Sequence, residues 1–475
     1  MDDLDRYDAL GLGELVRRGD VSAKALLDRA IARVEAVNPR INAVVLKHYD
    51  HARQQLAAGR PQGPFAGVPF LLKDLGATLA GTVTTDGSRA FADWTARADN
   101  NITRRAKAAG LTVFGKTASP EFGLTTTTES KLWGETRNPW NLERITGGSS
   151  GGAAAAVAAR ILPMAHASDG GGSIRIPASC CGLFGLKPSR GRVSYGAGVG
   201  IGWNGLSTQH AVTVSVRDSA ALLDALSGPE PGDSVVPPKA HGDFLDAVSR
   251  PPKPLRIALI ADAPTGVPLH ADCRAALDET VALLESLGHG VEPARLKLDT
   301  EAITAAFGAS ISVDLAARFE KRGAERGRPV GEDEIETISW MMAQRGKSVT
   351  GQTYAAARRT FDAAAVEVAR LWDSFDLFLS PTLAEPPGPL GRLGLSPPNI
   401  GDYGRALGAF SPYTALQNQT GVPAMSVPLH WNAEGLPIGV MFTAPHARED
   451  LLFSLAGQLE AERPWAARHP PVCAA

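Results

Sequence analysis

The feature that most constrains the fold of this chain is the run "TGGSSGGAAAA" at residues 146–156, in which two serines stand between two pairs of glycines. A flexible linker has this composition, but a linker does not continue directly into an alanine-rich helix. Glycine permits positive φ and close backbone approach, and a helix N-terminus presents N–H groups without internal partners. The run therefore predicts a sharp bend that aims a hydroxyl at a reaction centre, with an anion-binding nest as the simpler alternative.

A second glycine run, "DGGGS" at residues 169–173, repeats the pattern. Three glycines before Ser173 leave successive backbone N–H groups free to converge on one oxygen, which is the geometry of an oxyanion hole. A phosphate cradle is the alternative, but the Lys-Ser/Thr ending of a P-loop is missing. The two runs together favour chemistry on a carbonyl over nucleotide binding.

Lys73 is the candidate base. It follows the apolar residues 68–72 within a segment, 67–77, that is bounded by turn formers and predicts a buried strand. Most lysines are solvated surface charges, and that interpretation stays open for Lys73. Burial would disfavour the ammonium and lower the lysine pKa, as a base acting near neutral pH requires. Asp74 should point to the opposite face, because successive side chains of a strand alternate.

Composition excludes several function classes. The chain has 475 residues and is 44% hydrophobic, which is enough for one large domain or for two or three ordinary ones. A net charge of -2 without a basic stripe argues against nucleic acid or an anionic membrane as the main partner. The start, "MDDLDRYDAL", lacks the apolar segment of a secretory signal, and no apolar run reaches the roughly 18 residues of a membrane span. A cytoplasmic protein is therefore expected.

The cysteines and histidines indicate neither a disulfide framework nor a metal site. Cys180 and Cys181 are adjacent, which suits neither an ordinary disulfide nor a zinc pattern. Together with Cys273 and Cys473 they are expected to be reduced thiols. The ten histidines are scattered and no H-E-x-x-H motif occurs, so no metal and no organic cofactor is predicted.

Strand-like and helix-like segments alternate along the chain, which favours an α/β architecture. Helical spacing over 21–37, with Asp20 as N-cap, stops at the Asn-Pro-Arg of 38–40. The loop-like stretch 227–243 permits a domain boundary near 230–250, but further strand-like segments make one large domain as plausible. The other expected elements are strands over 111–117, 255–263 and 376–387, a helix running into a strand from 153, and a helix over 271–292.

These segments together resemble the amidase-signature hydrolases. The resemblance is carried by residues 146–194, from "TGGSSGG" through "SDGGGSIRIPASCCG" to "KPSRGRVS", and by "GVPFLLKD", "TRNPWN" and "TGVPAMSVPLHWNAEGLPIGVMF", so it covers nearly the whole chain. Within the family, the "SDGGGSIRIPASCCG" variant is most similar to the aminohexanoate cyclic-dimer (nylon oligomer) hydrolases. The resemblance implies a single α/β domain with a large twisted mixed sheet between helical layers. Its parts would be an N-terminal helical segment over about 1–60, a signature core over about 61–230 and a C-terminal part over about 250–475.

The resemblance also implies a Ser–cis-Ser–Lys triad. Ser173 would be the nucleophile, Ser149 the bridging serine after a cis peptide bond, and Lys73 the base. The backbone N–H groups expected to hold the oxyanion are those of Gly170, Gly171, Gly172 and Ser173, and the residues expected to brace these loops are Ser150, Asp169 and Arg175. Where this chain has Gly170 the family usually has a larger residue, often threonine, so a roomier acyl pocket is expected.

The implied activity is hydrolysis of carboxylic amide C–N bonds through an acyl-enzyme, with esters and carbamates or urethanes as further substrates. The expected partner is a small molecule, without nucleic acid or membrane. Two alternatives stay open: a glutaminase subunit of a transamidation complex, and a catalytically silent ligand-binding protein on the same scaffold. The sequence leaves open the physiological substrate, the preference between linear and cyclic amides, and the oligomeric state, for which a homodimer is one option.

Overall fold

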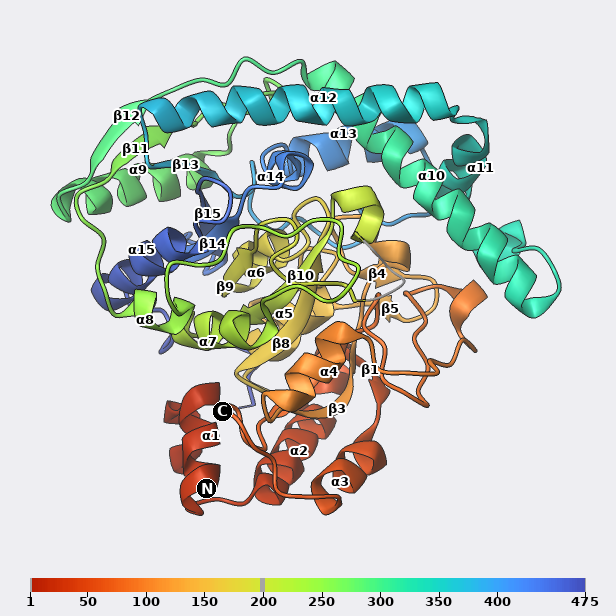
Figure 1. Ribbon diagram of the computed structural model, residues 1–475, viewed down its shortest axis with the longest axis vertical. Helices are drawn as coiled ribbons and strands as arrows, with labels where there is room; N and C mark the ends of the chain where they lie inside the picture. The colour runs from red at the N-terminus through yellow and green to blue at the C-terminus, as the bar shows by residue number, and fades with distance from the viewer. Residues whose placement is uncertain (1, 197–200, 475) are drawn as a thin grey trace.

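The computed structural model describes residues 2–196 and 201–474, and its centre is one large mixed sheet (Figure 1). Eight strands form this sheet, in the spatial order β12 (Gly290–Pro293), β11 (Arg256–Leu259), β13 (Leu377–Pro381), β15 (Pro437–Thr443), β14 (Ala424–Trp431), β9 (Phe184–Lys187), β10 (Thr208–Thr213) and β8 (Met164–Asp169). β11 runs parallel to both of its neighbours, and every other neighbouring pair is antiparallel. The predicted mixed sheet is therefore confirmed.

The sheet is shared by the two halves of the chain. β9 precedes the loop-like stretch 227–243 and β14 follows it, yet the two strands pair directly, with Ser426 opposite Gly185. A division near 230–250 into separate domains would cut this ladder. The chain folds as one α/β domain.

A smaller sheet carries the predicted base. It has the order β1 (Val44–Lys47), β3 (Thr112–Thr117) and β2 (Pro69–Lys73), with β1 antiparallel and β2 parallel to β3. All five residues of β2 are buried, and β2 packs beside β8 at the edge of the large sheet. Lys73, the last residue of β2, is thereby brought to the end of β8. Two further two-stranded ladders join β4 (Glu129–Ser130) to β5 (Gly134–Glu135) and β6 (Arg137–Asn138) to β7 (Asn141–Ile145).

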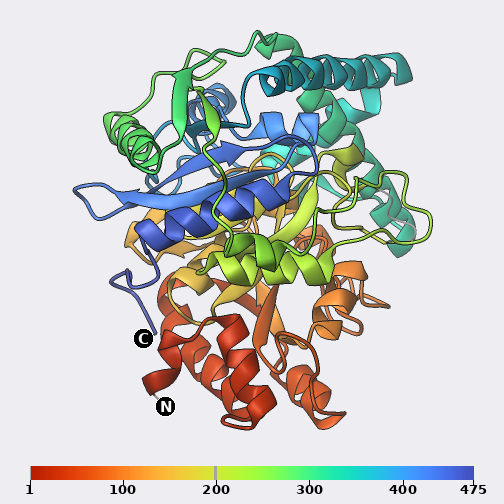
Figure 2. The same cartoon turned by 60° about the vertical axis from the view of Figure 1, so that its left-hand side comes forward.

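Helices cover both faces of the large sheet. α5 (Gly151–Ala158) and α6 (Arg175–Cys181) pack on one face, and α7 (Val216–Leu226), α9 (Ala271–Ser286) and α15 (Glu449–Glu462) pack on the other. Figure 2 shows α15 and α7 running along this second face beneath the blue strands β14 and β15. The remaining α-helices are α1 (Ala9–Arg18), α2 (Ala23–Ile41), α3 (Tyr49–Ala57), α4 (Asn101–Ala108), α8 (Phe244–Val248), α10 (Thr300–Arg326), α11 (Thr337–Ser348), α12 (Gly351–Ala369), α13 (Ile400–Phe410) and α14 (Ala415–Thr420).

The ends of α2 differ from the sequence prediction. Ser22, not Asp20, is the N-cap, because its Oγ accepts the N–H of Ala25 at 3.1 Å. The helix also continues through Pro39 to Ile41 and does not stop at 38–40. The side-chain oxygen of Asn38 accepts the N–H groups of Ala43 and Val44, which fixes the chain directly after the end of the helix. The strand expected over 111–117 is present as β3, whereas β11 and β13 cover only the first parts of 255–263 and 376–387. The helix expected over 271–292 ends at Ser286, and β12 follows it.

The glycine-rich stretch 196–202 includes residues 197–200, which lie outside the described part of the chain.

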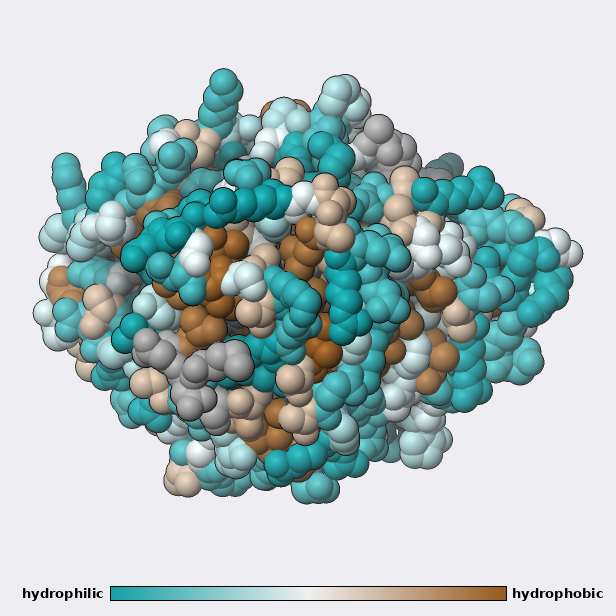
Figure 3. Space-filling view, turned by 90° about the horizontal axis from the view of Figure 1, so that it is seen from below, coloured by the Kyte–Doolittle hydropathy of each residue, from teal (hydrophilic) through white to brown (hydrophobic). Residues whose placement is uncertain are grey.

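α10 is long and apolar enough to cross a membrane, but core helices of soluble proteins can have the same length and composition. Its residues Leu315 and Phe319 are buried in contact with other parts of the fold. Seen from below, the surface is mostly hydrophilic, and hydrophobic residues show in the hollows (Figure 3).

Candidate active site

The two serine-bearing glycine runs meet at one cavity of about 250 Å³. Ser149, at the start of α5, and Ser173, just before α6, both line it. Ser168, the residue before the end of β8, lines it as well. The structure thus brings together two segments that the sequence marked separately.

The side chain of Lys73 contacts two of the serines that line this cavity. Its side chain is fully buried, and its Nζ lies 2.7 Å from the Oγ of Ser149 and 3.1 Å from the Oγ of Ser168. Its backbone N–H donates to Nδ1 of His166 at 3.1 Å, which fixes the end of β2 against β8. Burial lowers the pKa of Lys73 to about 7, although the carboxylates of Asp169 and Asp86 favour the charged form. A large fraction of the amine is therefore neutral near neutral pH.

Asp74 turns away from Lys73, as strand alternation predicts. Its carboxyl accepts the N–H of Thr85 at 2.9 Å, the hydroxyl of the same residue, and the indole N–H of Trp133 at 3.2 Å. Burial raises the pKa of Asp74 to about 6, while the nearby Lys116 acts in the opposite direction. No ion pair between Asp74 and Lys73 occurs in the described structure, so Asp74 does not hold the amine in its charged form by direct contact.

The two serines of "GGSSGG" have different surroundings. The Gly148–Ser149 peptide bond is cis. A Cβ on Gly148 would lie 2.4 Å from the carbonyl oxygen of Thr127, so only glycine fits before Ser149. Ser150 instead turns toward β8, where its Oγ donates to the carbonyl oxygen of Ser168 at 3.2 Å. Ser149 thus contacts Lys73, and Ser150 holds the backbone of the residue that also contacts Lys73.

The "DGGGS" run offers three free backbone donors, not the four expected. Gly172 donates its N–H to Oδ1 of Asp169 at 2.7 Å, so this group cannot serve an oxyanion. The N–H groups of Gly170, Gly171 and Ser173 make no hydrogen bond within residues 2–196 and 201–474. In the same part of the chain the hydroxyl of Ser173 has no hydrogen-bond partner, and it lines the cavity.

Asp169 and Arg175 form a buried ion pair beneath this loop. Both side chains are fully buried, and Nη2 of Arg175 lies 3.0 Å from Oδ1 of Asp169. Burial opposes ionisation of Asp169, but the guanidinium of Arg175 outweighs it and holds the pKa of the carboxyl well below its usual range. Asp169 also accepts the N–H of Ile174 at 3.1 Å. This arrangement fixes the loop on both sides of Ser173, as a bracing role requires.

Sequence reasoning missed several residues that complete the site. Ser168 contacts the amine of Lys73, and Asn418 on α14 donates to both the carbonyl and the carboxyl oxygens of Asp169. Thr414 donates its hydroxyl to the carbonyl oxygen of Gly171 at 2.7 Å. Ser168 directly precedes Asp169, so its position offered a local signal. Asn418 and Thr414 offered none, because they lie far along the chain.

The expected roomier pocket wall at Gly170 is wrong for this chain. A Cβ on Gly170 would come within 2.6 Å of Cε3 of Trp203, so the indole already occupies the space that a larger residue would fill. Trp203 lines the cavity, whereas Trp133 and Trp140 are not among its described lining residues. Trp140 instead packs against Trp431 and donates to the carbonyl of Cys181.

Other candidate groups lie outside the cavity. His210 is on β10, where its Nε2 lies 2.8 Å from the hydroxyl of Ser219 on α7, while its neighbour Gln209 lines the cavity from the opposite face of the strand. Cys180 and Cys181 are buried free thiols in α6. No cluster of three or more His, Cys, Asp or Glu side chains that could hold a metal ion occurs in the described ranges.

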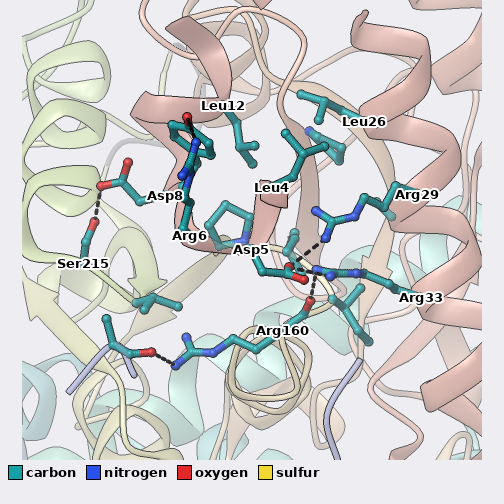
Figure 4. A pocket seen from close by; sticks show the side chains of 18 of the residues that line it. Leu4, Asp5, Arg6, Asp8, Leu12, Leu26, Arg29, Arg33, Arg160 and Ser215 are labelled. Atoms are coloured by element: carbon teal, nitrogen blue, oxygen red, sulfur yellow. Dashed lines mark hydrogen bonds and ion pairs between the residues drawn. The ribbon is translucent and has the colours of Figure 1, made fainter. Parts of the chain in front are cut away.

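A second cavity, of about 260 Å³, lies between the N-terminal segment and α2 (Figure 4). Arg29 and Arg33 on α2 both form ion pairs with Asp5 (Figure 4). The described lining holds five arginines and two aspartates, and its single serine, Ser215, donates to the carboxylate of Asp8 with no lysine beside it. The serine-lined cavity is the better candidate for the active site.

Comparisons with known proteins identify the family of this chain. The amidase family model matches residues 25–453. The chain is 40% identical to the 6-aminohexanoate-cyclic-dimer hydrolase of Paenarthrobacter ureafaciens, over 98% of this chain and 96% of that protein. A solved structure of a 6-aminohexanoate cyclic dimer hydrolase complexed with substrate superposes with a TM-score of 0.92, at 39% identity and 99% coverage of both chains. A bacterial aryl acylamidase of the amidase-signature enzymes superposes with a TM-score of 0.89, at 29% identity, covering 97% of this chain and 99% of that one. The chain therefore belongs to the amidase family and is an amidase-signature hydrolase of carbon–nitrogen bonds.

Proposed function

We propose that this protein is a serine amide hydrolase that works through an acyl-enzyme, with Ser173, Ser149 and Lys73 as its triad. The observation that carries the proposal is the 2.7 Å contact between the buried Nζ of Lys73 and the Oγ of Ser149, at the wall of a cavity that Ser173 shares. A neutral amine that donates an N–H to Ser168 keeps its lone pair for the hydroxyl proton of Ser149.

The steps follow from these positions. Ser173 attacks the amide carbon while its proton passes to Ser149 and the proton of Ser149 passes to Lys73. The N–H groups of Gly170, Gly171 and Ser173 receive the oxyanion. The proton returns through Ser149 to the leaving nitrogen, the C–N bond breaks, and water then cleaves the acyl-enzyme by the same relay. No cofactor takes part in these steps.

The proposed substrates are small carboxylic amides. We include cyclic amides because relatives with about 40% identity are cyclic-dimer hydrolases. Esters and carbamates or urethanes are included because their carbonyl groups pass through the same tetrahedral intermediates. The cytoplasmic location and the oligomeric state stay predictions.

The experiment that tests this proposal is labelling of the purified chain with a fluorophosphonate probe, followed by mapping of the adduct by mass spectrometry. We expect the adduct on Ser173, loss of labelling in Ser173→Ala, and full labelling of Ser374→Ala, a control at an exposed serine. A hydrolysis screen of amides, esters and carbamates runs in parallel, with Ser173→Ala as blank.

The same two assays separate the alternatives. Absence of labelling and of hydrolysis would favour a silent ligand-binding protein. Labelling of Ser173 with turnover only of glutamine, and only when a partner is added, would favour a glutaminase subunit. An adduct on Ser149 or on a cysteine would overturn the assignment of the nucleophile.

A further inference from the structure

One face of α10 closes the active-site cavity. Asp314 and Arg318 on this helix line the cavity together with Ser149 and Ser173. Phe307, two turns earlier on α10, lies against the glycine loop, since a Cβ on Gly171 would be 3.1 Å from its Cζ. Residues spaced by seven and four positions share one helix face. The charges that this face presents therefore belong to the substrate cavity.

The positive charge on this face is already compensated. Arg318 donates to Oδ2 of Asp86, and its guanidinium lies over the ring of Phe122, 5.4 Å from the ring centre. Asp86 is itself held in place, because its Oδ1 accepts the N–H of Gly76 at 3.1 Å. Arg318 is thus fixed in an ion pair and is not available to a substrate anion.

The negative charge of Asp314 is not compensated in this way. Its carboxyl makes no hydrogen bond and no ion pair within the described ranges, 2–196 and 201–474. Burial raises the pKa of Asp314, with Arg318 acting against the shift and Asp86 adding to it. The neighbouring Tyr195 donates its hydroxyl to Ser207. The cavity therefore contains one partly desolvated carboxyl group that no cation of the described residues contacts in an ion pair, although Arg318 lies near enough to act on it.

We propose that Asp314 selects substrates that carry a protonated amine away from the scissile carbonyl, so that the preferred substrates are ammonium-bearing amides. This inference rests on the proposed hydrolase function and narrows its substrate class. An ammonium supplies positive charge and three N–H donors, which an ionised carboxylate accepts in short, charge-assisted hydrogen bonds. A neutral substrate leaves the carboxyl without a partner, and a carboxylate-bearing substrate is repelled by it.

The test uses two p-nitroanilide substrates of equal chain length, one acylated with an ω-amino acid and the other with the alkanoic acid in which a methyl group replaces the ammonium. The quantity of interest is the ratio of their kcat/KM values. We expect Asp314→Asn to lower this ratio by at least about tenfold, which corresponds to roughly 1.4 kcal/mol, with the loss confined to the ammonium substrate. Glu320→Gln, which removes an exposed carboxylate of the same helix, should leave the ratio unchanged.

Each other outcome contradicts the inference. An unchanged ratio in Asp314→Asn would show that the carboxyl does not recognise the substrate. An equal loss for both substrates would show that Asp314 acts only through the structure of the cavity. Kinetics of Asp314→Ala and the melting temperatures of Asp314→Asn and Asp314→Ala would check this result. The hydrolase function is tested separately with the uncharged anilide, whose turnover should be lost in Ser173→Ala.

A binding measurement keeps the two proposals separable. Calorimetric titration with an n-alkylammonium chloride, against the alcohol of equal length, needs no turnover. We expect tighter binding of the ammonium to the wild-type protein and loss of this difference in Asp314→Asn. If the difference is present and no amide is hydrolysed, the hydrolase proposal fails alone. If neither the wild-type protein nor Asp314→Asn binds the alkylammonium more tightly than the alcohol, the proposed role of Asp314 is wrong.

Discussion

The indole of Trp203 lies against Gly170, with Cε3 only 2.6 Å from the position that a Cβ of residue 170 would take. Trp203 belongs to the 3-10 helix η4 (Gly202–Gly205), where it and Asn204 have φ values of 50° and 54°. Non-glycine residues in this region cost on the order of 1 kcal/mol or more. The protein thus keeps a tryptophan in a strained position beside the loop that carries Ser173.

Gly170→Thr should therefore reduce activity on small and bulky amides alike, because the new side chain collides with Trp203 and shifts the loop. We expect kcat/KM to fall about tenfold or more for both. The double variant Gly170→Thr/Trp203→Ala removes the collision and should recover most of the loss for small amides. Kinetics of the two single variants and the double variant form the test, and additive losses would show that the two side chains do not compete for space.

The pH dependence of kcat/KM should follow the amine of Lys73. Since the amine acts as a base only when neutral and its pKa is lowered to about 7, activity should rise with pH through an apparent pKa near 7 and stay high above it. Lys73→Ala should cost several orders of magnitude for amides and less for activated esters, whose leaving groups depart without protonation. The measurement is the pH profile of kcat/KM for one amide and one ester.

Lys73→Arg provides the matched control for this profile. A guanidinium stays protonated in proteins, so the variant keeps the charge type but cannot accept a proton. We expect it to be as inactive on amides as Lys73→Ala. Near-normal amide turnover by Lys73→Arg would exclude lysine as the base.

Ser168→Ala should slow the chemical step with little effect on substrate binding. Among the described residues the amine of Lys73 hydrogen-bonds to the hydroxyls of Ser149 and Ser168, and loss of the Ser168 hydroxyl leaves the amine free to rotate away from Ser149. We expect kcat to fall about 10- to 100-fold at nearly constant KM. Ser168→Thr keeps a hydroxyl at the same position and should restore most of the rate. A change confined to KM would assign Ser168 to substrate binding instead.

Asp169→Asn should destabilise the fold, because it leaves the buried guanidinium of Arg175 without its counter-ion. The expected loss is about 3–5 kcal/mol in the free energy of unfolding. Since the folded-state pKa of Asp169 lies below its usual value of 3.8, this stabilisation is complete at neutral pH and is lost as the pH falls below about 4. Denaturant unfolding at several pH values should show the difference between wild type and variant shrinking in acid.

Asp402→Asn is the control for that measurement. Asp402 pairs with Arg405, but both side chains are mostly exposed, and surface pairs contribute about 0–1 kcal/mol. We expect a change below about 1 kcal/mol at neutral pH. A loss at Asp169 no larger than this would show that the buried pair does not hold the loop.

Removal of metal ions should leave amide turnover unchanged. The described residues place no three His, Cys, Asp or Glu side chains together as metal ligands, and the proposed steps use only protein groups. Activity is compared before and after dialysis against EDTA. Loss of most activity, with recovery on adding zinc or manganese, would contradict the triad mechanism.

The local features of the site could be predicted from the sequence. The apolar residues before Lys73 make β2 a buried strand, and strand alternation turns Asp74 away from the amine. The glycines around Ser149 meet a steric requirement, since any side chain on Gly148 would collide with backbone. These outcomes depend on a few neighbouring residues, whose preferences act within one strand or one turn. The assignment of catalytic roles came from the resemblance to a family.

Only the tertiary structure decided which segments meet and which polar groups stay free. It engages the N–H of Gly172 with Asp169, sets Trp203 against Gly170, and brings Asp314 on α10 into the cavity. In each of these contacts the partner's position is set by the packing of elements that are distant in the sequence. Local propensity does not determine this packing, because a strand or helix of the same sequence can present the same side chains to many different neighbours.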